Sequence, residues 1–182
     1  VALLDRLAHR HLGELADEEQ RRWARVVLLG GFLFLLFGLA WAASFLAYGQ
    51  VLVAAIMAGG ALVLPAIILT ARSPAGLRLG IQLWLLTLLL SVSLANGLAG
   101  GLAGSNVATF VAIPLAALLL SARAAWVWGL LTAAVMTGFQ VAHLRGYEFA
   151  MVIPSEYQAF DQTWTWAAVM MFVTGWSFFY ER

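Results

Sequence analysis

Six long apolar segments divide this chain, and they constrain its fold more than any other feature. They occupy residues 26–48, 51–70, 79–98, 103–120, 124–141 and 164–180. Each is close to the roughly 20 residues that a helix needs to cross about 30 Å of hydrocarbon. The segments lack the apolar/polar alternation of barrel strands, and inside a bilayer a helix is the other way to satisfy every backbone amide. The sequence therefore predicts an all-α, polytopic membrane protein built as a six-helix bundle.

The composition agrees with this class. Apolar residues make up 63 % of the chain and charged residues 10 %, whereas a soluble domain carries about 25 % charged residues. We divide the chain into residues 1–24, a cytoplasmic lead-in, and residues 25–182, the transmembrane domain.

The arginines predict the orientation of the bundle. Nine of the ten precede the first segment, follow the last, or join segments two to three and four to five, whereas Arg145 alone lies in the opposite connections. Basic residues are enriched in cytoplasmic loops. Both termini are therefore expected to be cytoplasmic.

An amphipathic helix is expected before the first span. Apolar residues recur at three- and four-residue spacing from Leu4 to Leu15, with charged residues between them, which is typical of a helix lying in the inner interface. Asp17 and Gln20 have the spacing of a capping box, so a second helix is expected to start there. The first helix is either a surface anchor or a contact to a neighbouring subunit or domain.

Several cofactor chemistries are excluded by composition. Without cysteine there is no disulfide, iron–sulfur cluster or thiolate zinc site, and without lysine there is no Schiff base to retinal. The predicted topology separates His9 and His11 from His143, so one chain offers no bis-histidine haem site. We expect no cofactor, no metal and no nucleic-acid partner.

Polar side chains gather near the outer ends of the predicted spans. In hydrocarbon an unpaired polar group costs several kcal/mol, so such groups tend to face a bundle interior or a cavity. We expect them to converge on one outward-opening pocket for a small, mostly apolar ligand with one polar end. The candidate ligand-binding residues are Trp41, Asn96, Ser105, Asn106, Gln140, His143, Glu148 and Trp164.

Two local features bear on this pocket. Residues 96–106 contain four glycines and no charge, so this connection either tucks into the mouth of the bundle or forms a flexible linker. Pro65 and Pro114 each remove a helical hydrogen bond and are expected to bend their helices. His143 has two interpretations. It is either a ligand-binding or pH-sensing group, since a histidine can change charge near neutral pH, or an interfacial hydrogen-bonding residue.

A glycine-rich string begins at Asn96 and reads Asn-Gly-Leu-Ala-Gly-Gly-Leu-Ala-Gly-Ser. A proline-containing span follows, and then Ser-Ala-Arg-Ala-Ala-Trp-Val-Trp-Gly, which ends at Gly129. This stretch resembles the six-helix sensor regions of bacterial signalling proteins. In that group a membrane module precedes a histidine kinase, diguanylate cyclase or class III adenylyl cyclase, and quorum-sensing kinases of the CqsS type share the layout. Where those proteins have a Ser-Pro pair, Ser105 is here followed by Asn106.

The resemblance implies a bacterial inner-membrane location and a homodimer. It also implies signal output through the last helix, at Tyr180, Glu181 and Arg182. Small residues on the first span, Gly30, Gly31 and Gly38, offer close helix contacts either between subunits or within one chain.

We weigh three functions and favour a receptor or input domain without enzymatic activity of its own. A small transporter or channel is expected to carry ionisable residues near the midplane, discontinuous helices or inverted repeats. An intramembrane hydrolase using Ser105 and His143 lacks the glycine expected after the nucleophile. Because the chain begins at Val1 rather than Met, we expect it to be trimmed, processed or part of a longer protein.

Overall fold

A computed structural model describes residues 18–70, 73–103, 109–118, 120–149 and 153–180. These residues form helices and connections without any β-strand. The helices are α2 (Glu18–Ala47), α3 (Val51–Thr70), α4 (Pro74–Leu98), the short 3₁₀ helix η1 (Gly101–Ala103), α5 (Thr109–Ala117), α6 (Ala122–Leu144) and α7 (Ser155–Tyr180). The all-α class is confirmed for this part of the chain.

The helices differ from the predicted spans mainly at their starts. α3 coincides with the predicted second span, whereas α2, α4, α6 and α7 begin two to nine residues earlier than predicted. Apolar length marks only the stretch that suits hydrocarbon, and these helices extend into polar flanks such as Glu18–Arg25. The predicted amphipathic helix before residue 17 lies outside the described residues.

Three helices are long and apolar enough to cross a membrane, judged among the described residues. The qualifying stretches are Gly30–Ala47, Ala75–Leu98 and Ala122–Leu144, and a shorter apolar stretch covers Val51–Ile67. α5 has nine residues, about 14 Å at 1.5 Å per residue, and residues 104–108 before it are not described. The structure thus agrees with a membrane protein at the level of these helices, and six spans are not established by it.

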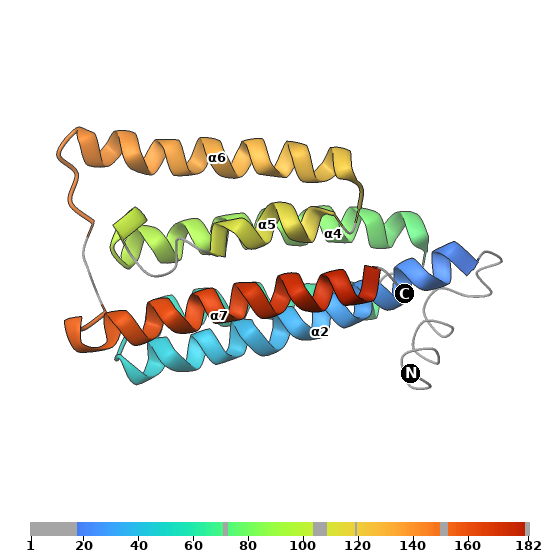
Figure 1. Ribbon diagram of the computed structural model, residues 1–182, viewed down its shortest axis with the longest axis horizontal. Helices are drawn as coiled ribbons and strands as arrows, with labels where there is room; N and C mark the ends of the chain where they lie inside the picture. Colours follow the sequence, from blue (N-terminus) through green and yellow to red (C-terminus); the bar gives the residue numbers. More distant parts are fainter. Residues whose placement is uncertain (1–17, 71–72, 104–108, 119, 150–152, 181–182) are drawn as a thin grey trace.

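Successive long helices run in alternating directions (Figure 1). We call the end of the bundle where α2, α4 and α6 finish the distal end, and the opposite end, where α2 begins and α7 finishes, the proximal end. α2 packs against α3, α3 against α4 and α5 against α6, while α7 lies on α2 and α5. Both ends of the described chain therefore lie at the proximal end.

Serines and glycines fix several helix ends. The Ser73 and Ser121 side chains each accept a hydrogen bond, at 3.0 Å, from the backbone N–H three residues later, which caps α4 and α6. α2 and α6 are followed by Gly49 and Gly146, with φ of 76° and 84°. Glycine adopts this left-handed conformation without steric cost, so the chain can reverse direction immediately after each of these helices.

The buried residues form two clusters along the bundle. The proximal cluster centres on Ile81, Trp84, Phe110, Ile113 and Trp128. The distal cluster includes Trp41, Phe45, Val53, Ala95 and Ile153 and brings together α2, α3, α4 and the residues before α7.

The small residues of α2 are used inside the chain. Gly30 and Gly31 are buried, and a Cβ on Gly38 would collide with the Cβ of Ala61 on α3. Of the two roles expected for these glycines, close contact within one chain is the one that the structure contains.

α6 is the least covered of the long helices. Its side chains Trp126, Leu130 and Leu144 are 75 %, 66 % and 75 % exposed. Such a continuous apolar surface needs a hydrophobic environment, as a bilayer would provide.

Candidate functional site

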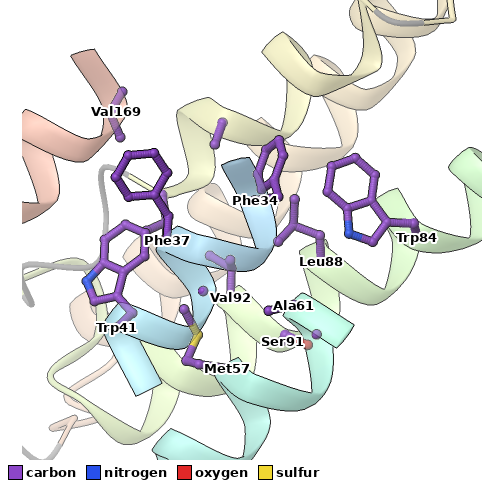
Figure 2. A pocket seen from close by; sticks show the side chains of 14 residues that line it. Phe34, Phe37, Trp41, Met57, Ala61, Trp84, Leu88, Ser91, Val92 and Val169 are labelled. Atoms are coloured by element: carbon purple, nitrogen blue, oxygen red, sulfur yellow. The ribbon is translucent and has the colours of Figure 1, made fainter. Parts of the chain in front are cut away.

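An apolar cavity lies at the centre of the bundle, between α2, α3, α4, α5 and α7 (Figure 2). Phe34, Phe37 and Trp41 project into it from α2, and Met57, Gly60 and Ala61 lie on α3. Further lining comes from α4 at Trp84, Leu88, Ser91 and Val92, from α5 at Thr109 and Ala112, and from α7 at Val169. None of these lining residues has an ionisable side chain, so the cavity suits an apolar, uncharged group.

The cavity has a volume of about 60 Å³. A cavity needs about 10–15 Å³ to hold one water molecule, so there is room for several groups of water size. A methylene group is of comparable size. A short alkyl chain therefore fits, and a larger body requires the helices to separate.

The spacing of the aromatic residues on α2 explains this wall. Residues 34, 37 and 41 are three and four positions apart, which places them on one helix face. The ring of Phe34 meets Trp84 of α4 edge-on, with centroids 4.6 Å apart and an interplanar angle of 79°. This edge-to-face pair joins α2 to α4 on the proximal side of the cavity.

Three buried polar atoms have no hydrogen-bond partner among the described residues. They are Trp41 Nε1 on α2, Asn96 Oδ1 on α4 and Thr165 Oγ1 on α7. Trp41 is 8 % exposed, and Asn96 and Thr165 are 0 % exposed. A buried polar atom without a partner carries the cost of its lost hydration.

Trp41 lines the cavity, and helix register places Asn96 and Thr165 one turn beyond its lining. Asn96 follows the lining residue Val92 by one turn on α4, and Thr165 precedes the lining residue Val169 by one turn on α7. Residues four apart share a helix face. Because α4 runs toward the distal end and α7 away from it, both polar residues lie on the distal side, where Trp41 packs in the cluster that also contains Ala95 and contacts Trp164.

Only part of the predicted site is brought together. Trp41, Asn96 and Trp164 lie at the distal side of the cavity, the first two buried and the third half-buried. Gln140 and His143 on α6 are exposed, so they are not gathered with Asn96 as expected. Their role in ligand binding, which exposure alone does not test, stays a prediction.

The other predicted residues lie elsewhere. Glu148 is exposed in the connection between α6 and α7, and Tyr180 is the last residue of α7. Ser105, Asn106, Glu181 and Arg182 lie outside the described residues.

The glycine-rich connection is tucked against the bundle in its described part. Ala99, Gly100 and Gly101 are buried, and a Cβ on Gly101 would lie 2.5 Å from a ring carbon of Phe149. Gly101 also has a φ of 61°. Of the two readings of this segment, the structure favours the packed one over the flexible linker.

Thr165 and the phenylalanines of α2 were not identified from the sequence. The three- and four-residue spacing of Phe34, Phe37 and Trp41 is a signal that could have found the wall. Thr165 is one of several threonines on α7, and nothing in the sequence separates it from Thr163, which is exposed and donates to Ala159 O.

No protein-family model, curated protein or solved structure matches this chain. Among the described residues no group of three or more histidine, aspartate or glutamate side chains could hold a metal ion. The inference of function therefore depends on the cavity and on the sequence pattern.

Proposed function

We propose that this chain is the membrane-embedded input domain of a bacterial signalling protein, and that it binds a small apolar or amphiphilic molecule in the central cavity. The observation that carries this proposal is the cavity itself. Five helices line it, its lining has no ionisable residue, and α7 supplies part of its wall through Val169. A binding site walled by α7 is suited to changing the position of that helix.

In this proposal six helices span the inner membrane with both termini cytoplasmic. The positions of the arginines support this orientation. The alternating helix directions support it as well, since the start of α2 and the end of α7 share the proximal end (Figure 1). The distal end, with Trp41 and Asn96 near it, then faces the periplasm.

Signalling requires that the ligand bind one arrangement of the helices more tightly than another. α7 packs on α2 and α5, so a ligand that shifts α7 against these helices changes the position of Tyr180 at the proximal end. We propose that this movement is passed within a homodimer to a cytoplasmic effector, such as a kinase or nucleotide cyclase.

The test measures movement of α7 in lipid nanodiscs. Because the chain has no cysteine, spin labels can be attached at Ala75→Cys on α4 and Thr174→Cys on α7, both exposed positions. We expect 1-pentanol, a probe of suitable size, to shift the distance distribution between the two labels.

Filling the cavity with Ala112→Leu is expected to abolish that shift. Ala134→Leu, an exposed position on α6, is the matched control and keeps it. An unchanged response in the Ala112→Leu protein contradicts binding in this cavity. Measurable flux of pentanol-sized solutes or ions through proteoliposomes would instead support a transporter.

A further inference from the structure

The three unpaired polar atoms contrast with several hydroxyl groups of the same helices, which are satisfied locally. Six other hydroxyls in the described helices donate to the carbonyl four residues earlier, and these are Ser44, Thr87, Ser93, Thr132, Thr137 and Thr163. Thr165, fully buried, has no such bond.

Asn96 is only half satisfied. Its Nδ2 donates to Val92 O at 2.9 Å, and this bond holds the side chain in one orientation along α4. Among the described residues the Oδ1 atom has no partner, and Asn96 has no exposed surface. The site therefore has a fixed, desolvated acceptor.

The unmet requirements of the three side chains are complementary to one chemical group. Trp41 Nε1 can only donate, Asn96 Oδ1 can only accept, and the Thr165 hydroxyl can do either. A hydroxyl group has one donor and two acceptor lone pairs. Its hydrogen-bonding capacity therefore matches the three unmet requirements, since it can accept from Trp41 and Thr165 and donate to Asn96.

Charged groups do not fit. A carboxylate has no proton to donate to Asn96, and an ammonium group cannot accept from Trp41. Neither finds a counter-charge, since no ionisable residue lines the cavity, and an unpaired buried charge is strongly unfavourable.

We propose that Trp41, Asn96 and Thr165 form the polar anchor of the ligand site, and that they select an uncharged molecule with a hydroxyl at one end of an apolar chain. This inference rests on the proposed function and names the class of ligand for the same cavity. The apolar chain of the ligand occupies the space between Phe34, Met57 and Ala112, and its hydroxyl lies at the distal side. Because the anchor takes one group from each of α2, α4 and α7, its occupation ties the position of α7 to the other two helices.

The test uses the chain in lipid nanodiscs with ¹⁵N-labelled tryptophan and ¹³C-labelled methionine methyl groups. The chain has eight tryptophans, and the Trp41 indole signal is identified by its absence in Trp41→Phe. The methyl signal of Met57, which lines the cavity, reports occupation of the apolar part. 1-Pentanol and pentane are titrated at matched concentrations in the bilayer.

We expect pentanol to shift both the Met57 methyl and the Trp41 indole signals, and pentane to shift only the Met57 signal. Asn96→Leu and Thr165→Val each remove one hydrogen bond to the hydroxyl and are expected to weaken pentanol binding about fivefold. Neither change alters pentane binding. Thr163→Val, two residues away on α7, is the matched control and leaves both affinities unchanged.

Three outcomes are decisive. Equal affinities for pentanol and pentane, with the Trp41 signal unmoved, would overturn the anchor while leaving the apolar cavity in place. A Trp41 indole already hydrogen-bonded to an ordered water, which pentanol does not displace, would also overturn the anchor. If neither probe moves the Met57 signal, the cavity is not a binding site and the proposed function fails with it. The remaining indole signals show whether each variant is folded.

Discussion

Two buried tryptophans show how differently the two ends of this bundle treat the same chemical group. Trp128 on α6 and Trp41 on α2 are 7 % and 8 % exposed. The indole nitrogen of Trp128 donates to Gln82 Oε1 on α4 at 2.7 Å, whereas that of Trp41 has no partner among the described residues.

The difference follows the position of the cavity. Gln82 and Asn96 are 14 residues apart on α4, about 21 Å at 1.5 Å per residue. The side chain of Gln82, an exposed residue, joins α4 to α6 at the edge of a packed cluster through its bond with Trp128. Near Asn96, beyond the distal side of the cavity, buried polar atoms have no partner among the described residues. We infer that the proximal pair serves stability and that the distal atoms serve binding.

The largest effect is expected from truncating Trp128. Trp128→Ala removes a buried ring and the hydrogen bond to Gln82, and loss of a buried aromatic side chain costs about 3–5 kcal/mol. Thermal unfolding in mild detergent measures the loss. Trp126→Ala, two residues earlier and 75 % exposed, is expected to change stability little. Equal losses in the two variants would argue against a packed proximal cluster.

A smaller loss is expected when only the acceptor of that pair is removed. Gln82→Leu leaves Trp128 Nε1 buried without a partner, which costs about 1–3 kcal/mol. A double-mutant cycle with Trp128→Phe isolates the pair, and in membrane bundles such couplings average about 0.6 kcal/mol and reach about 1.7 kcal/mol. A coupling of zero would remove the contrast between the two tryptophans.

A change in stability of the opposite sign is expected from a substitution at the distal end. Asn96→Leu gives up the bond to Val92 O, worth about 1 kcal/mol, and also removes an unpaired acceptor whose burial costs about 1–3 kcal/mol. Stability measured by thermal unfolding should therefore stay the same or rise by up to about 2 kcal/mol. A clear loss of stability would mean that Asn96 is structural and would weaken the case for an anchor.

The smallest effects are expected on the exposed face of α6. Gln140→Leu and His143→Gln change surface side chains, for which stability shifts stay within about 0.5 kcal/mol. Pentanol binding, followed by the Met57 signal, should also be unaffected. A large loss of binding in either variant would support the sequence-based pocket over the one that the structure contains.

Apolar length was sufficient to predict most helices. α3 was predicted to the residue, and α2, α4, α6 and α7 were predicted apart from their polar extensions. A long apolar run in hydrocarbon must satisfy its backbone amides within the segment, and a helix does this. α5 is described for nine residues where 18 were predicted, and residues 104–108 and 119, which flank it, lie outside the described part of the chain.

The inward faces of the helices were not predictable in the same way. α6 is apolar around most of its circumference, so the sequence does not indicate that Gln140 and His143 lie on its outer side. Asn96 was identified because a carboxamide in the last turns of a long apolar helix is costly wherever it points outward. Thr165 could not be identified, because a threonine in a helix normally satisfies its own hydroxyl, and its lack of a bond depends on packing alone.

The contact between Gly101 and Phe149 restricts which sequences could share this distal closure. A side chain at position 101 is disfavoured twice, by a φ of 61° and by the Phe149 ring 2.5 Å from where a Cβ would stand. A distant relative that folds in this way is therefore expected to keep glycine there. The aromatic partner is the more variable half, because a smaller residue at 149 relieves the crowding but not the backbone conformation. This pair, some 50 residues apart in the sequence, is a signature by which such relatives can be recognised when overall sequence identity is low.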